Sequence, residues 1–216
     1  MTPNQRGILF MTLGMGGFAV EDAFIKLAAE TLMPGQIMLT IGVLGTLVFA
    51  AAARRRRHAV WTRDALHWAV MGRNISEMVG SGAYVLALAF VPLTLVTSIF
   101  QAMPLAVTMG AALFLGERVG WRRWLAILVG FAGVILIIRP GGQAFEAASL
   151  LAVVSVLGLA ARDIFTRRIR AAVDTTQLTT WGFAAVALVG GGQLLVSGGA
   201  RIPTSGEAAL LAGSLV

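Results

Sequence analysis

Seven long apolar stretches, separated by short turn-forming segments, limit what this chain can fold into more than any other feature. A helix needs about 20 apolar residues to cross the hydrocarbon core of a bilayer. The stretches reach that length and cover residues 7–29, 35–53, 65–90, 93–115, 121–138, 147–165 and 178–196, and an eighth begins near Ala208. Charged residues make up only 12% of the chain, about half the usual fraction of a soluble domain. The sequence therefore predicts an all-α polytopic membrane protein whose outer surface faces the lipid bilayer.

The distribution of basic residues between the loops predicts the orientation of these spans. Cytosolic loops of membrane proteins are enriched in Lys and Arg. If the N-terminus is cytosolic, Arg139 and Arg201 fall outside and Lys26, Arg73 and Arg162 fall within spans. The other twelve basic residues are then cytosolic: Arg6, Arg54, Arg55, Arg56, Arg57, Arg63, Arg118, Arg122, Arg123, Arg167, Arg168 and Arg170. We expect a multi-pass protein of the cell inner membrane with a cytosolic N-terminus, and no nucleic-acid partner.

An internal repeat becomes visible when the chain is shifted by 141 residues. The shift aligns Gly17 with Gly158, Ala19 with Ala160, Asp22 with Asp163, Phe24 with Phe165, Lys26 with Arg167 and Gln36 with Gln177. Five spans separate the two copies, so the second copy enters the membrane from the opposite side, as in inverted-repeat transporters. We expect five helices in residues 1–140 and a partial second repeat in residues 147–216. A complete second copy would continue past Val216 by about three spans, which predicts a truncated chain; the alternative is an intact protein with a degenerate second half.

A set of motifs near the middle of the chain resembles one transporter family. The motifs are Pro104-Leu105-Ala106-Val107, then Phe114-Leu115-Gly116-Glu117-Arg118, then Trp124, Gly130, Phe131, Gly133 and Val134. They resemble the EamA family of the drug/metabolite transporter superfamily. The resemblance implies a five-helix inverted-repeat transporter bundle, here with an incomplete second repeat. It also implies secondary transport of a small metabolite, such as an amino acid, a nucleotide-related compound or a drug, by alternating access.

Charged residues near the ends of two spans are candidates for gating or coupling. A charge at the bilayer centre costs about 2.5–3.5 kcal/mol on insertion scales, so charged groups in spans tend to face protein or a water-filled cavity. Asp22 and Lys26 are four residues apart and share a helix face with Glu21 beside them. Asp163 and Arg167 repeat this pair at the cytosolic mouth. The two pairs are interpreted either as alternating gates or as structural ion pairs that stabilise the fold.

A second set of polar residues is predicted to line a cavity or bind substrate. One stripe at helical spacing lies in the third span, and further polar residues lie in the fourth and seventh spans. The candidates are Arg73, Asn74, Glu77, Ser81, Tyr84, Thr97, Gln101 and Trp181. Three alternatives stay open: an ion pair that only neutralises Arg73 and Glu77, hydroxyls that bond neighbouring helices, and a Trp181 that faces lipid. Glu117 is expected to organise its own turn with Arg118 or Arg122.

Several functional classes lack the residues that they require. The chain has no cysteine and only two histidines, which lie in or beside one basic loop, so no metal site or cofactor is expected. It has no phosphate-binding Gly-x-x-x-x-Gly-Lys motif and no nucleophile with a histidine base inside a span. The expected function is therefore that of a transporter and not of an enzyme. A non-transporting scaffold or an inactive fragment is the alternative, and a homodimer is left open.

Overall fold

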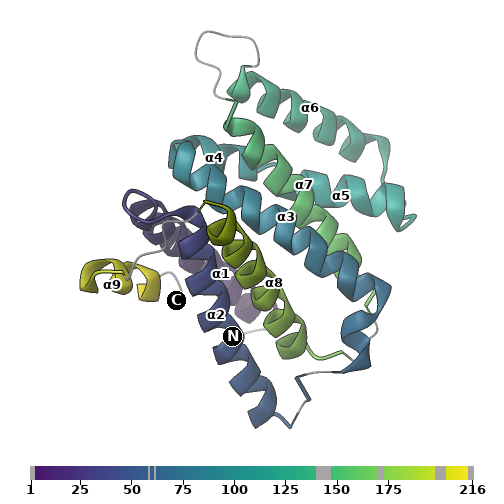
Figure 1. Cartoon of the computed structure of the whole chain (residues 1–216). Helices are drawn as coiled ribbons and strands as arrows, with labels where there is room; N and C mark the ends of the chain where they lie inside the picture. The colour runs from purple at the N-terminus through teal and green to yellow at the C-terminus, as the bar shows by residue number, and fades with distance from the viewer. Residues whose placement is uncertain are drawn as a thin grey trace.

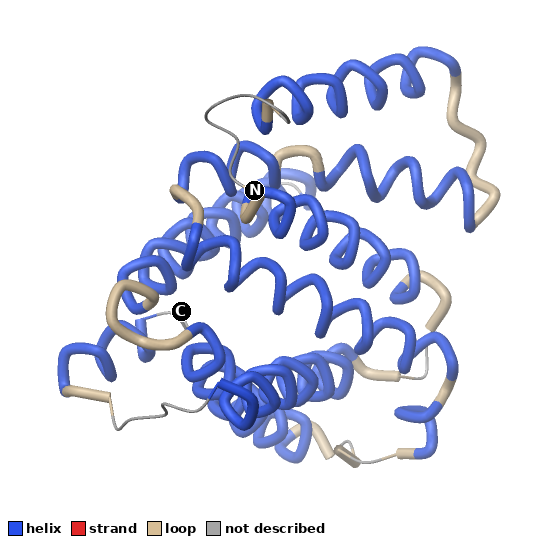
Figure 2. Tube along the Cα trace, turned by 45° about the horizontal axis from the view of Figure 1, so that its top comes forward, coloured by secondary structure: helices blue, strands red, loops and turns tan. Residues whose placement is uncertain are grey.

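The computed structural model describes residues 3–57, 59–60, 62–139, 147–169, 173–197 and 203–213, and these residues form helices joined by short loops (Figure 2). Arg170 and Arg201, two of the basic residues used to predict orientation, lie outside the described residues. The helices are α1 (Pro3–Ala28), α2 (Pro34–Arg55), the short 3₁₀ helix η1 (Arg63–Leu66), α3 (Trp68–Phe90), α4 (Leu93–Phe100), α5 (Met103–Phe114), α6 (Trp121–Ile138), α7 (Ser149–Thr166), α8 (Thr175–Ser197) and α9 (Ser205–Gly213).

Six segments of the described chain are long and apolar enough to cross a membrane, where the sequence predicted seven. The exception is α3, whose 23 residues would reach about 35 Å at 1.5 Å per residue. Its length is sufficient, but its polar stripe lowers its hydropathy. The predicted fourth span is divided into α4 and α5 by Gln101 and Ala102, and Pro104 lies in the first turn of α5. Proline cannot donate the helical hydrogen bond, so Pro104 leaves the carbonyl of Phe100 without its usual helical donor at this break.

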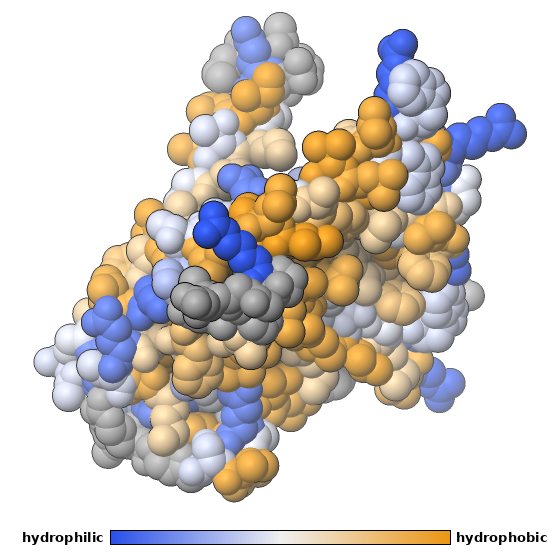
Figure 3. Space-filling model, turned by 90° about the horizontal axis from the view of Figure 1, so that it is seen from above, coloured by the Kyte–Doolittle hydropathy of each residue, from blue (hydrophilic) through white to orange (hydrophobic). Residues whose placement is uncertain are grey.

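Apolar side chains dominate the exterior of the bundle. Phe10 and Met11 of α1 are 70% and 73% exposed, and Leu136 of α6 is 72% exposed. Hydrophobic side chains (orange) cover much of the face shown in Figure 3. Monomeric soluble proteins rarely expose contiguous apolar surface on this scale. The chain is thus a multi-pass all-α membrane protein, as the sequence predicted.

Two antiparallel helix pairs, α2 with α8 and α3 with α7, make the most extensive contacts of the bundle. Figure 1 shows α3 and α7 between the α1, α2 and α8 group and the peripheral α6. Glycines allow the backbones to approach: a Cβ on Gly42 of α2 would lie 2.4 Å from the backbone nitrogen of Ala187. A Cβ on Gly158 of α7 would lie 2.7 Å from the Cα of Gly80 of α3. Small residues at helix crossings are a common device of membrane proteins, where close packing takes the place of the hydrophobic effect.

Two further contacts are reciprocal under the 141-residue shift. Phe165 of α7 packs against Gly72 of α3, where a Cβ would lie 2.7 Å from its ring. Phe24 of α1 packs against Gly213 of α9, where a Cβ would lie 2.8 Å from its ring. Because Phe24 aligns with Phe165 and Gly72 aligns with Gly213, each contact is the other with the two halves exchanged. The repeat predicted from the sequence pairs the two phenylalanines, and the structure adds their glycine partners.

Candidate functional site

Four charged side chains meet where α3 crosses α7. Glu77 Oε2 lies 3.4 Å from Arg73 Nη2 and 3.3 Å from Arg162 Nη1. The other side of the Arg162 guanidinium donates to Asp163 Oδ1 from Nη2 at 2.9 Å and from Nε at 3.0 Å. Arg73 and Glu77 are one helical turn apart on α3, so they share a face that looks toward α7. Two cations and two carboxylates therefore form one cluster with no net formal charge, which we call the α3–α7 charge cluster.

Neighbouring polar groups and close helix packing keep this cluster in place. The Ser81 hydroxyl donates to Glu77 Oε1 at 2.8 Å, and Arg73 Nη1 donates to Asn74 Oδ1 at 2.9 Å. The side chains of Glu77 and Arg73 are only 10% and 11% exposed. A Cβ on Gly182 of α8 would lie 2.9 Å from Arg73 Nη1, so the missing side chain leaves room for the guanidinium. The predicted residues Arg73, Asn74, Glu77 and Ser81 therefore lie together with their polar atoms facing one another.

A second polar group lies where α1 meets α3. The Tyr84 hydroxyl is a hydrogen-bonding partner of the Asp22 carboxyl, and Glu21 is close enough to interact electrostatically with both. The Tyr84 ring also packs on Phe100 of α4, with ring centroids 4.9 Å apart. Tyr84 thus extends the α3 stripe toward α1, as its helical spacing from Ser81 predicts.

Lys26 contacts a helix end in place of the expected Asp22. Its ammonium donates to the carbonyl oxygens of Leu88 at 2.6 Å and Val91 at 2.9 Å. Leu88 would normally bond the backbone N–H four residues later, but that residue is Pro92, which has none. The last carbonyls of a helix also attract cations. The predicted Asp22–Lys26 pair is therefore wrong, because Lys26 instead bonds the Leu88 carbonyl, which Pro92 leaves without a donor, and the Val91 carbonyl at the end of α3.

The predicted pair of Asp163 with Arg167 does not form either. Asp163 bonds its neighbour Arg162, and Arg167 Nη1 instead bonds Glu117 Oε1 at 2.7 Å. Gly116 has a φ of 71°, which turns the chain after α5 so that Glu117 meets the end of α7. The expectation that Glu117 pairs with Arg118 or Arg122 is corrected accordingly. This acidic residue joins two helix ends that are far apart in the sequence.

Three other predicted residues lie away from the charge cluster. The Thr97 hydroxyl donates to the carbonyl of Leu93 in its own helix at 2.9 Å. Gln101 lines a small cavity between the α4–α5 break and α6. The Trp181 indole donates to the Val60 carbonyl at 2.8 Å, and Trp181 is 5% exposed. Trp181 therefore holds the segment between α2 and α3 and does not face lipid.

Two residues of this region were missed by sequence reasoning. Arg162 was recognised only as a basic residue within a span, although it joins α7 to Glu77 of α3. The signal that could have found it is the cost of an intramembrane charge, which requires a partner. Ser155 lies seven residues before Arg162, two turns along the same face of α7. It is fully buried, and its hydroxyl has no hydrogen-bond partner in the described part of the chain.

The charge cluster presents guanidinium and carboxylate groups, which are suited to charged and polar partners. Its guanidinium and carboxylate groups are already paired, so a solute with a charged or strongly polar group can exchange partners with them. No group of three or more His, Asp or Glu side chains suited to a metal ion occurs within the described residues. The arrangement fits reversible recognition of a polar solute.

Comparison with known proteins places the chain among transporters. Residues 5–139 match the EamA-like transporter family. The riboflavin transporter of Rhizobium johnstonii is 34% identical over 150 residues, which is 68% of this chain and 49% of the relative. An S-adenosylmethionine uptake transporter of Rickettsia bellii is 28% identical over 96 residues, 44% of this chain and 33% of the relative. The pseudopaline exporter of Pseudomonas aeruginosa is 26% identical over 188 residues, 86% of this chain and 65% of the relative.

These relatives are named as transporters, and the chain spans less than two thirds of the length of each. The family match itself covers well over half of the chain and includes the charged stripe of α3 and the turn at Glu117. This chain belongs to the EamA-like transporter family of the drug/metabolite transporter superfamily.

Proposed function

We propose that this chain acts in secondary transport, moving a small polar metabolite across the cell inner membrane by alternating access. In this proposal the N-terminus is cytosolic, and the α3–α7 charge cluster lies along the path of the solute. The observation that carries the proposal is the ion pair between buried Glu77 and partly buried Arg162, which belong to different predicted repeats. Charged residues inside a membrane bundle are typical of substrate and ion pathways.

The ion pair also suits a moving interface. In inverted-repeat transporters, one repeat rocks against the other around a site near the midplane. Glu77 lies on α3 in the predicted first repeat, and Arg162 lies on α7 in the predicted second repeat. A solute that binds either side chain would compete with their 3.3 Å contact. Binding and the relative movement of the repeats would thereby be coupled.

The reciprocal glycine–phenylalanine contacts support the two-repeat arrangement. Phe165 against Gly72 and Phe24 against Gly213 are related by the same 141-residue shift as the sequence repeat. A pseudo-twofold axis between the predicted repeats would generate such a pair of contacts. The repeats at 1–140 and 147–216 therefore remain our proposal for the domain organisation.

The relatives indicate a solute class for this proposal. Their names give riboflavin, S-adenosylmethionine and pseudopaline, all polar molecules larger than a simple ion. We propose a heteroatom-rich metabolite of comparable size that bears a charge or several hydrogen-bonding groups. Asp22 with Lys26, and Asp163 with Arg167, keep their predicted role as gates at the two mouths, acting through the separate partners that each residue contacts.

Uptake into proteoliposomes tests this function. We expect radiolabelled riboflavin or S-adenosylmethionine to accumulate in vesicles that contain the chain, and a pH gradient to change the initial rate. Glu77→Gln should lower that rate about tenfold, equivalent to about 1.4 kcal/mol, because the neutral amide weakens recognition at the cluster. The matched control is Glu30→Gln, an exposed carboxyl in the turn between α1 and α2, which should transport like the unmodified chain.

Three outcomes would contradict different parts of the proposal. If Glu77→Gln transports at the unmodified rate, the charge cluster is not on the solute path. If neither probe is bound or moved by the unmodified chain, the proposed solute class is wrong. A folded chain that binds a probe at Glu77 but never accumulates it would favour the non-transporting scaffold.

A further inference from the structure

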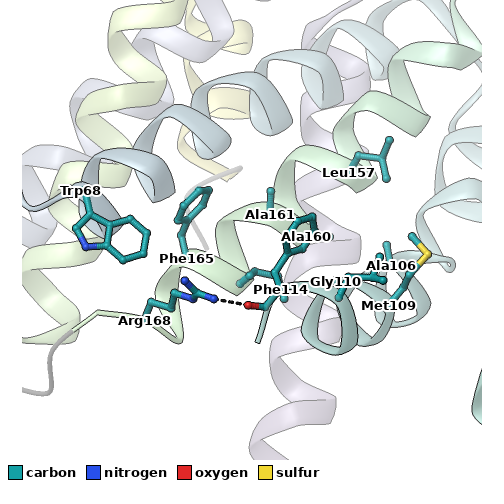
Figure 4. Close-up of a pocket in the computed structure, with 12 residues that line it drawn as sticks. Trp68, Ala106, Met109, Gly110, Phe114, Leu157, Ala160, Ala161, Phe165 and Arg168 are labelled. Atoms are coloured by element: carbon teal, nitrogen blue, oxygen red, sulfur yellow. Dashed lines mark hydrogen bonds between the residues drawn. The ribbon is translucent and has the colours of Figure 1, made fainter. Parts of the chain in front are cut away.

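An apolar groove lies outside the charge cluster, where α7 faces α5. It has a volume of about 310 Å³ and runs between α5 and α7 to the start of α3. Figure 4 shows its lining side chains, with Leu157 near one end and Trp68 and Arg168 near the other. Apart from Arg168, the twelve lining residues are apolar, aromatic or glycine. The groove is therefore apolar along its length and cationic at one end.

The cationic end lies where α5 and α7 end and α3 begins. Arg168 lies over the Trp68 ring, 5.8 Å from its centroid, and donates to the carbonyl of Phe114. Next to it, Arg167 is held by Glu117 of the turn after α5. These contacts fix the position of the Arg168 guanidinium but use only part of its five N–H donors. Since Arg168 is exposed, the remaining donors are available to an anion.

We propose that this groove binds an anionic phospholipid, with an acyl chain along α5 and α7 and the phosphate at Arg168. The rim residues Leu113 and Phe114 are 60% and 66% exposed on the apolar exterior, so an acyl chain can enter directly from the bilayer. Trp68 suits the headgroup level, where tryptophan is enriched. The predicted orientation also places this end at the cytosolic leaflet, which is rich in anionic lipid.

A phospholipid fits the groove better than a helix from a second copy. A helix would bury Arg168 and would then need an acidic side chain to compensate its charge, whereas a phospholipid brings its own phosphate. Phosphate and guanidinium form short charge-assisted hydrogen bonds. The apolar length of the groove beyond Arg168 likewise excludes free inorganic phosphate as a sufficient occupant.

Native mass spectrometry of the detergent-purified chain tests the proposal, with phosphatidylglycerol and phosphatidylcholine of identical acyl chains as probes. The unmodified chain should bind phosphatidylglycerol about fivefold more tightly than phosphatidylcholine, because only the former has a net negative charge and one basic residue gains about 1 kcal/mol with anionic lipid. Arg168→Gln should abolish this preference, and Arg168→Lys should keep most of it. Arg123→Gln, which removes another exposed arginine at the same predicted end, should bind like the unmodified chain.

A second variant tests the apolar part without changing charge. Ala161→Leu places extra volume in the groove and should weaken binding of both lipids, while thermal unfolding in detergent confirms that each variant is folded. Three results would overturn the proposal: an unchanged lipid preference in Arg168→Gln, unchanged binding in Ala161→Leu, or a dimer that Ala161→Leu dissociates. The last result would identify a second copy as the occupant. Because transport by Glu77 variants is measured separately, failure here leaves the proposed function to its own test.

Discussion

Replacing Glu77 with alanine is expected to lower the free energy of unfolding by about 3–5 kcal/mol, the cost of breaking a buried ion pair by removing one partner. Glu77 is the shared acceptor for Arg73 and Arg162, and its side chain is 10% exposed. Without it, two guanidinium groups face each other with Asp163 as the remaining carboxylate. The uncompensated charge should weaken the packing of α3 against α7. This contact is one of the two most extensive in the bundle.

The control is the second interhelical ion pair of the described structure. Glu117→Gln breaks the contact with Arg167, but both side chains there are about half exposed. Exposed ion pairs are worth about 0–1 kcal/mol, so this variant should unfold almost like the unmodified chain. Titration with sodium dodecyl sulfate, followed by far-ultraviolet circular dichroism, measures both. Equal effects of the two substitutions would mean that burial does not distinguish the two ion pairs.

Gly42→Ala should destabilise the chain by about 1–3 kcal/mol, as overpacking does in other tightly packed interiors. The added Cβ would lie 2.4 Å from the backbone nitrogen of Ala187 and 2.7 Å from its Cα. Backbone atoms cannot rotate away as a side chain can. Helices α2 and α8 must therefore separate, and their contact is among the most extensive in the bundle.

A glycine-to-alanine substitution at a position without close neighbours should not destabilise the chain. A Cβ on Gly133 of α6 would meet no atom within 4 Å. Alanine is favoured over glycine within a helix by roughly 0.5–1 kcal/mol, so Gly133→Ala should leave stability unchanged or raise it. Thermal unfolding in detergent compares the two variants. Similar destabilisation by both would contradict the account, because helix propensity favours alanine at both positions and only Gly42 lies in the α2–α8 contact.

The sequence predicted the helices well because their apolar length and their turn residues are local signals. Pro34, Pro92 and Pro104 each lie at a helix start in the structure. The prediction of α3 as an apolar span was less accurate, since α3 carries charges that only its central position makes tolerable. Hydropathy describes a helix as though all its faces met lipid, whereas the polar face of α3 meets other helices.

The sequence identified those residues of the charge cluster that lie on one helix, but not their partners on other helices. Helical spacing identified Arg73, Glu77 and Ser81 because they share one face of a single helix. It could not identify Arg162 as their partner, since 85 residues separate it from Glu77 and only the fold joins them. Lys26 was paired with Asp22 on spacing alone. The carbonyls that it actually contacts, of Leu88 and Val91, are available because α3 ends before Pro92, more than sixty residues later.

The absence of cysteine makes one measurement especially direct. In native membranes, Ser81→Cys places a single thiol beside Glu77, and only a thiolate in contact with water reacts with a charged methanethiosulfonate reagent. We predict that this thiol reacts and that a transported solute protects it. Val79 is 50% exposed on the apolar exterior of α3. Val79→Cys should stay unreactive because its thiol faces lipid. A thiol at position 81 that never reacts, while Arg56→Cys in the loop does, would contradict a solute path along the α3–α7 charge cluster.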